Sequence, residues 1–163
     1  MDSAARHHYV SRVSPRQESF NVFAPAAAPI SPREHQLLDH FIDILTPVTN
    51  PVIYGAADKP VIRKALDDIL RCATEDRACK HAVIADAAWH RVGLFKKNNQ
   101  MIEHNHARVE ALYHFTEAFR LLRLKLQDRR ERKSESAIIA VRHLGTVSVS
   151  SGPSNDPTWD WCR

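Results

Sequence analysis

The sequence contains few cysteines and no long apolar run. Its three cysteines, Cys72, Cys79 and Cys162, are odd in number and irregularly spaced, which excludes a framework of disulfide bonds. No run of about 18 apolar residues is present, so we expect no membrane-spanning segment. The first residues lack the apolar core of a secretory signal peptide. These absences predict a protein of a reducing compartment, the nucleus or the cytoplasm.

Glycine and aromatic residues are also scarce. The 163 residues include four glycines, and aromatic side chains make up 7% of the chain. Alanine, leucine, isoleucine, arginine and histidine are common, and this balance favours helices. The sequence has no glycine-rich phosphate loop, no strand–serine–helix elbow and no cysteine–histidine pair with supporting motifs. We therefore expect no enzyme activity and no catalytic or cofactor-binding residues.

The distribution of apolar residues divides the chain into three parts. Residues 1–30 show no helical or strand periodicity and include a run of alanine and proline, so we expect a disordered N-terminal arm. Apolar residues at helical spacing fill residues 31–145, which predicts one helical domain. Residues 146–163 are rich in polar and turn-forming residues, and we expect a flexible tail that carries Trp159 and Trp161.

The first two predicted helices have recognisable boundaries. Ser31 suits the N-cap, Pro32 suits the first helical position, and Glu34 completes a capping box. Pro47 is expected to end this helix, because proline disrupts a helix interior. A second helix is expected over residues 58–73, where apolar residues again recur at helical spacing.

An alanine-rich helix and a long helix follow. The alanine-rich helix is predicted from its cap region at residues 74–76 to about Phe95, and its composition is typical of a helix packed on several sides. The long helix is predicted over Met101–Lys133. Its large apolar residues recur at steps of three and four and predict a packing face: Leu112, Phe115, Phe119, Leu122 and Leu126. Ala111 and Ala118 beside this face would allow a neighbouring helix to approach closely.

A fifth helix is predicted from Ser134 to Gly145, where the glycine is expected to end it. Short connections between consecutive helices favour antiparallel packing. The predicted fold class is therefore all-α: a bundle of four to five antiparallel helices over residues 31–145, with disordered N- and C-terminal tails.

Positive charge is concentrated at the end of the long helix. The chain has a formal net charge of +4, while residues 120–133 alone hold seven basic and two acidic residues. A nucleic-acid-binding domain usually spreads cations over a face with aromatic residues between them, and no such pattern is present. Three interpretations stay open: a solvated helix end that complements the dipole, a nuclear import signal over Arg129–Lys133, or contact with nucleic acid.

Two sets of histidines are candidate sites. His106, Glu110 and His114 lie four residues apart, so one face of the long helix presents two imidazoles and a carboxylate, which are ligand types of zinc and iron. A solvated polar face explains the same residues, and we expect no metal ligands, because no matching Glu-x-x-His pair appears elsewhere. His81 and His90 are expected to be partly buried and hydrogen-bonded.

Four segments, taken in order, resemble the fungal-specific transcription factor regulatory domain, the middle homology region found beside many binuclear zinc-cluster DNA-binding domains. The resemblance rests on an opening apolar helix, an alanine-rich helix with His-Ala near its start, a helix of alanine, aromatic and leucine residues, and a further alanine-containing helix: Leu37–Val48, Lys80–Leu94, Ala111–Asp128 and Ser134–Leu144. It implies a helical domain that acts in transcription regulation. Tetratricopeptide helices have a similar spacing of alanine and aromatic residues, and they are the alternative.

The sequence also departs from that family's usual pattern. Members normally carry a six-cysteine zinc cluster before this domain and continue for several hundred residues after it. Three cysteines cannot build such a cluster, so no sequence-specific DNA binding is expected. We expect a regulatory domain in the nucleus, alternatively in the cytoplasm, that binds a protein partner or a second copy of itself through apolar helix faces. The second hypothesis is a tetratricopeptide-like adaptor, and the third is a metal-binding enzyme that uses His106, Glu110 and His114.

Overall fold

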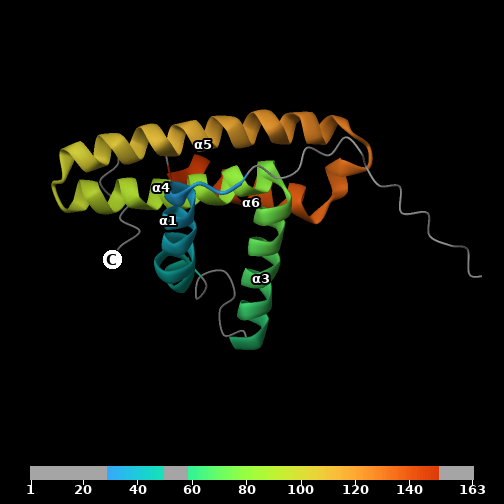
Figure 1. Cartoon of the computed structure of the whole chain (residues 1–163), viewed down its shortest axis with the longest axis horizontal. Coiled ribbons are helices and arrows are strands. Elements are labelled where there is room, and N and C mark those ends of the chain that lie inside the picture. Colours follow the sequence, from blue (N-terminus) through green and yellow to red (C-terminus); the bar gives the residue numbers. More distant parts are fainter. Residues whose placement is uncertain (1–28, 50–58, 151–163) are drawn as a thin grey trace, which may run out of the picture.

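The computed structural model describes residues 29–49 and 59–150, and its regular secondary structure in these ranges is helical (Figure 1). Five α-helices follow one another: α1 Pro32–His40, α3 Lys59–Glu75, α4 Arg77–Lys97, α5 Met101–Gln127 and α6 Glu135–Ser150. A π-helical turn, η1 Phe41–Leu45, continues α1, and a 3-10 turn, η2 Glu131–Lys133, precedes α6. The prediction of an all-α bundle of four to five helices is confirmed. None of the described helices is both long and apolar enough to cross a membrane.

Helix α4 lies at the centre of the domain. It contacts α1, α3, α5 and α6, and all residues from Ala78 to Ala88 are buried. A helix that is buried around its whole circumference needs narrow side chains, because its neighbours must approach from several directions. Five alanines in this segment meet that need: Ala78, Ala82, Ala85, Ala87 and Ala88. The alanine-rich helix is thus packed on several sides, as predicted from its composition.

Helices α4 and α5 form an antiparallel hairpin in which α5 runs along α4 (Figure 1). The turn between them includes Asn99, whose φ of 56° lies in the left-handed region that asparagine tolerates better than most residues. The buried residues of α5 recur at steps of three and four and include three alanines: Ala107, Ala111, His114, Ala118 and Leu122. The close approach predicted at Ala111 and Ala118 is therefore present.

The predicted packing face of α5 is partly wrong. Leu122 is buried and Phe115 is half-buried, but Leu112, Phe119 and Leu126 are 46%, 60% and 43% exposed. The buried face is rotated towards the alanines, because α4 is close to α5 along its length and only small side chains fit between the two axes. The large apolar residues of the same helix are consequently turned outward.

Three predicted helix ends are also wrong. The first helix does not stop at Pro47, since residues 46–49 are helical. The π-turn widens the helix just before Pro47, and the Thr46 N–H and hydroxyl both donate to the Phe41 carbonyl. A wider turn accommodates a proline ring that would otherwise clash with the preceding turn.

The long helix ends at Gln127 rather than at Lys133. Asp128 adopts an extended backbone conformation, and its carboxylate accepts hydrogen bonds from the Arg130 and Glu131 N–H groups. Such a local side-chain bond competes with helical bonding and starts a turn. The last helix passes through Gly145 and reaches Ser150, because burial of Val147 outweighs the small helix penalty of one glycine.

Other helix starts agree with the sequence. Ser31 and Glu34 form the predicted capping box, in which the Ser31 hydroxyl accepts from the Glu34 N–H and the Glu34 carboxylate accepts from the Ser31 N–H. The Asp76 carboxylate caps α4 by accepting from the Cys79 N–H at 2.8 Å. The Ser134 hydroxyl accepts from the Ala137 N–H at the start of α6. Residues 1–28, Asp58 and residues 151–163, which include Trp159 and Trp161, lie outside the described residues.

Replacing Ala118 with leucine should test the close packing of α5 on α4. Ala118 is fully buried, so Ala118→Leu should lower the free energy of unfolding by about 1–3 kcal/mol. Thr116→Leu is the matched control, because Thr116 is exposed on the same helix and its free energy of unfolding should change by less than about 0.5 kcal/mol. Chemical denaturation of both variants makes the measurement. Equal stabilities for the two variants would show that the alanine face is not tightly packed.

Candidate functional site

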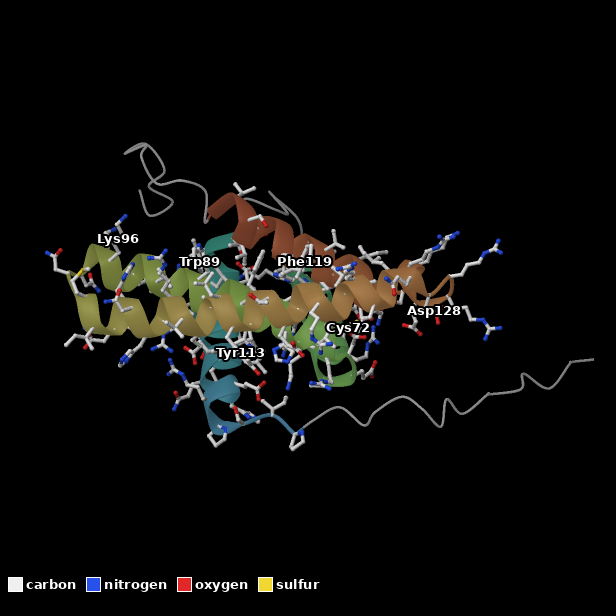
Figure 2. All side chains as sticks on the ribbon, turned by 90° about the horizontal axis from the view of Figure 1, so that it is seen from above. Cys72, Trp89, Lys96, Tyr113, Phe119 and Asp128 are labelled. Carbon is white, nitrogen blue, oxygen red and sulfur yellow. The ribbon has the colours of Figure 1, made fainter. Side chains whose placement is uncertain are left out.

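The outward face of α5 is apolar over most of its length. Five exposed residues define what we call the outer stripe: Ile102, Val109, Leu112, Phe119 and Leu126, which are 71%, 69%, 46%, 60% and 43% exposed. They occupy positions at steps of seven or three residues and therefore share one side of the helix. From Ile102 to Leu126 the stripe extends for about 36 Å at a rise of 1.5 Å per residue. Figure 2 views the domain from the side of α5, with Phe119 on this helix.

The charges beside the outer stripe are all positive. Arg108, Arg120 and Arg123 are exposed and lie at or next to the stripe by helical spacing. The acidic residues of α5 recur every seven residues on another side of the helix: Glu103, Glu110 and Glu117. Arg120 reaches across to Glu117 at 2.6 Å, whereas Arg123 makes no ion pair with any residue in the described ranges. The outer face of α5 thus combines large apolar side chains with cations.

The predicted basic run has two structural roles. Lys125 is mostly buried and forms ion pairs with Asp76 and with Glu131, the latter at 3.2 Å, and it donates to the Ser136 hydroxyl at 2.8 Å. This lysine therefore joins the end of α5 to the starts of α4 and α6. The remaining cations of Arg129–Lys133 are exposed in the turn before α6. They flank one end of the outer stripe.

The three residues predicted to share a polar face of α5 differ in burial and in their partners. His106 is exposed, and Glu110 accepts two hydrogen bonds of 2.7 Å from the Arg33 guanidinium of α1. His114 is buried and meets His81 of α4, with 2.9 Å between their Nδ1 atoms. Helical spacing indicated a common face, but Glu110 binds α1, His114 binds α4, and His106 remains exposed.

His81 and His114 share their surroundings with a buried ion pair. The Lys80 ammonium lies 3.0 Å from the Glu34 carboxylate, and both side chains are largely buried. Burial lowers the pKa of His81 to about 4 and also lowers the pKa of His114. Burial alone would raise the pKa of Glu34, but hydrogen bonds from Ser31 and Lys80 hold it at about 2. At neutral pH the cluster therefore contains one carboxylate, one ammonium and two neutral imidazoles.

A second histidine pair joins α1 to α4. His40 Nε2 and His90 Nδ1 are 2.9 Å apart, and both rings are half-buried, in agreement with the prediction for His90. Burial and the neighbouring His90 lower the pKa of His40 to about 4, and burial lowers the pKa of His90. Both rings are therefore neutral in the folded domain at pH 7, and one of the two nitrogens donates the hydrogen bond to the other.

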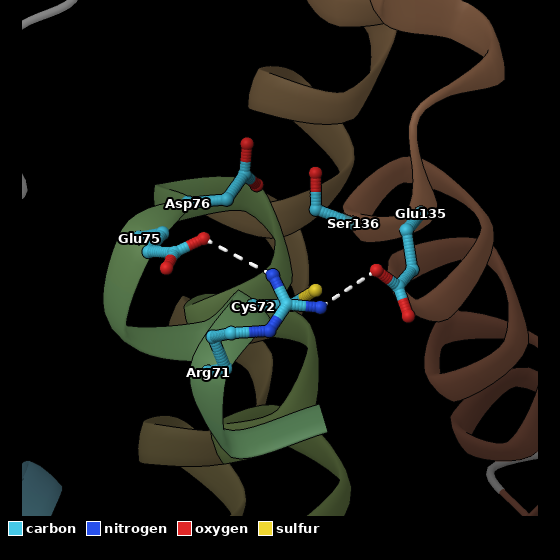
Figure 3. A pocket seen from close by; sticks show the side chains of 6 residues that line it. All are labelled: Arg71, Cys72, Glu75, Asp76, Glu135 and Ser136. Atoms are coloured by element: carbon cyan, nitrogen blue, oxygen red, sulfur yellow. Dashed lines mark hydrogen bonds and ion pairs between the residues drawn. The ribbon is translucent and has the colours of Figure 1, made fainter. Parts of the chain in front are cut away.

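The two described cysteines are not activated nucleophiles. A shallow hollow of about 280 Å³ lies where α3, α4 and α6 meet, and Figure 3 shows Arg71 across it, joined to Glu75 and Glu135 at 3.3 Å and 2.7 Å. Cys72 lines this hollow, and Cys79 is fully buried. Burial raises the pKa of both thiols, so neither is a thiolate at neutral pH. Both cysteines are free and buried.

Comparison with known protein families decides between the alternatives for this fold. The sequence profile described as the fungal specific transcription factor domain matches residues 36–162, which is most of the chain. The chain belongs to the fungal-specific transcription factor domain family. This family is a class of transcription factor regulatory domains and not an enzyme family. No curated protein and no solved structure matches the chain.

The packing of the fungal-specific transcription factor domain also differs from the tetratricopeptide alternative. Tetratricopeptide arrays stack helix pairs so that each repeat contacts only its neighbours. Here α4 contacts helices that come before and after it in the chain, including α1 and α6. The helices therefore surround one central element instead of forming a stack.

Acidification should destabilise the domain through the His40–His90 pair. The folded-state pKa of His40, about 4, lies below its unfolded value near 6.5, so the unfolded chain binds more protons as the pH falls. The stability contributed by the neutral pair is complete above pH 6.5 and is lost between about pH 6.5 and 4. We expect His40→Gln to make the dependence of unfolding free energy on pH between 6.5 and 4.5 less steep, measured by denaturation at each pH, while His81 maintains part of that dependence.

The control for this prediction is His106→Gln, which removes an exposed histidine from α5. It should leave the pH profile of the wild-type protein unchanged. The interval above pH 4.5 avoids titration of Glu34, whose pKa is near 2. A His40→Gln profile as steep as that of the wild type would contradict the assignment.

Proposed function

We propose that this domain regulates transcription in the nucleus by binding a protein partner along the outer stripe of α5. Membership of the transcription factor family supports the regulatory role, and the exposed stripe is the observation that supports the mode of action. Contiguous exposed apolar residues on a folded domain commonly mark a surface that binds another macromolecule. Burial of one leucine or phenylalanine side chain contributes about 1.5–3 kcal/mol, so the stripe offers enough apolar surface for a specific complex.

The shape and charge of the stripe favour an amphipathic helix as the partner segment. Apolar residues at heptad-like spacing pack best against a second helix with the same spacing. Arg108 and Arg123 favour acidic residues beside the apolar positions of that partner. A second copy of α5 would instead bring like charges together, because the outer face of α5 has no acidic residue by helical spacing.

We do not propose sequence-specific DNA binding by this chain. A binuclear zinc cluster needs six cysteines, and the sequence has three. Lys125 of the basic run is occupied by ion pairs within the domain. The exposed cations of Arg129–Lys133 remain available for the nuclear import machinery or for an acidic partner.

A tethering experiment would test the proposed function. The full chain is fused to an unrelated DNA-binding domain in a fungal host, and transcription of a reporter with the matching binding site is measured. We expect the fusion to change reporter output, and we expect Leu112→Glu combined with Phe119→Glu to remove this change, because the two carboxylates would break the apolar stripe. Unaltered output from the double variant would contradict a role for the outer stripe.

Two controls keep that experiment interpretable. Val61→Glu combined with Ile138→Glu places the same charges at exposed apolar positions on α3 and α6, and it should retain wild-type output. Thermal melts of all fusions exclude loss of folding. Light scattering on the purified chain distinguishes the two possible partners of the outer stripe. A dimer that Phe119→Glu dissociates would show that the stripe binds a second copy of this chain and not a different protein.

A further inference from the structure

One polar cluster of the domain plays no part in the proposed partner binding. Glu34, His81 and His114 come from the first turn of α1, from α4 and from α5, and one potential ligand atom of each lies within 4.8 Å of the other two. Both imidazoles are buried, with 5% and 6% exposure, and the carboxylate is half-buried. Two imidazoles with one carboxylate form the ligand set of many zinc sites.

The spacing of these atoms approaches that of a tetrahedral centre. Zinc bonds of about 2.0–2.1 Å to nitrogen and oxygen place the ligand atoms about 3.3 Å apart. The two Nδ1 atoms are already 2.9 Å apart, so a small separation of the rings would admit an ion between them. A carboxylate oxygen of Glu34 lies within 4.8 Å of a nitrogen of each imidazole, so it would have to move by at most about 1.5 Å to reach this spacing.

We propose that Glu34, His81 and His114 bind one divalent transition-metal ion of the zinc class. The ion joins the start of α1 to the α4–α5 hairpin, and a water molecule completes the coordination. Ligands from three helices explain why no spacing along one helix revealed the site. The proposal concerns a different surface from the outer stripe and does not depend on the proposed function.

The histidine pair can offer two ring nitrogens to one ion after a change of tautomer. In the metal-free pair, one Nδ1 carries a proton and donates a hydrogen bond, which the other Nδ1 accepts. Metal binding requires the first ring to change tautomer, so that both rings offer Nδ1 and keep a proton on Nε2.

Lys80 is the group that competes with the ion. Its ammonium holds the Glu34 carboxylate at 3.0 Å, and metal binding would have to release that contact. The acidic residues of α5 that face the two histidines, Glu110 and Glu117, add negative potential that favours a cation. Tyr113 packs edge-on against both imidazoles, with ring centroids 6.2 Å and 5.0 Å away.

Cobalt and zinc titrations of the chelator-treated full chain would test the site. Cobalt(II) bound by two imidazoles and a carboxylate gives visible d–d absorption, and zinc should displace it with a stoichiometry of one. We expect Glu34→Gln to weaken cobalt binding at least 10-fold while the domain stays folded, because glutamine also completes a capping box at this position. Lys80→Met should strengthen binding several-fold, because it removes the competing ammonium.

Control variants separate this site from other histidines. His104→Ala combined with His106→Ala removes two histidines that lie outside the cluster on α5, and His7→Ala combined with His8→Ala removes an adjacent pair elsewhere in the sequence. Both should bind cobalt like the wild type. Absence of one-to-one binding by the folded wild-type protein, or equal affinity in Glu34→Gln, would overturn the proposal and leave a hydrogen-bonded histidine pair.

Discussion

The burial of α4 on all sides is the constraint on which the rest of the domain depends. A helix enclosed by four others has room only for small side chains at most of its positions. Its neighbours must also place small residues at the contacts with it. Helix α5 does so with Ala107, Ala111 and Ala118, and α6 does so with Ala137 and Ala140. Tight contact between these faces leaves the large apolar residues of α5 on the opposite side. The close packing of α4 against its neighbours and the exposure of the outer stripe therefore have the same cause.

The polar residues of α4 give this alanine-rich packing its specificity. Alanine faces alone define neither a rotation nor a register, because many alignments of two smooth surfaces are nearly equal in energy. Three buried polar residues each find a partner on a different helix: Lys80 with Glu34 of α1, His81 with His114 of α5, and Asp86 with His143 of α6. Removing one partner would leave a polar group buried without a hydrogen bond, which costs about 1–3 kcal/mol. Displaced arrangements of α1, α5 or α6 are disfavoured for this reason.

The sequence predicted what depends on local chemistry and missed what depends on neighbouring helices. Ser31 could be recognised as a cap, and Asp76 lies within the predicted cap region at residues 74–76, because a cap is completed within four residues. The buried face of α5 could not be chosen, since alanine and leucine stripes overlap on that helix and only the proximity of α4 decides between them. Asp128 ended the helix earlier than the apolar pattern indicated, and the π-turn before Pro47 has no recognised sequence signal. The pairing of His81 with His114 joins residues 33 positions apart, and spacing along one helix carries no information about it.

The distribution of charge on α5 follows from the same division between inner and outer faces. Glu110 and Glu117 recur seven residues apart and are used within the domain, where they bind Arg33, Arg120 and the more distant Arg77. Because these carboxylates form ion pairs within the domain, Arg108 and Arg123 have no described acidic partner on the face that carries the outer stripe. An apolar surface bordered by cations alone repels a second copy of itself and attracts acidic helices. The internal electrostatics of the domain therefore set the charge of the face to which the proposed partner would bind.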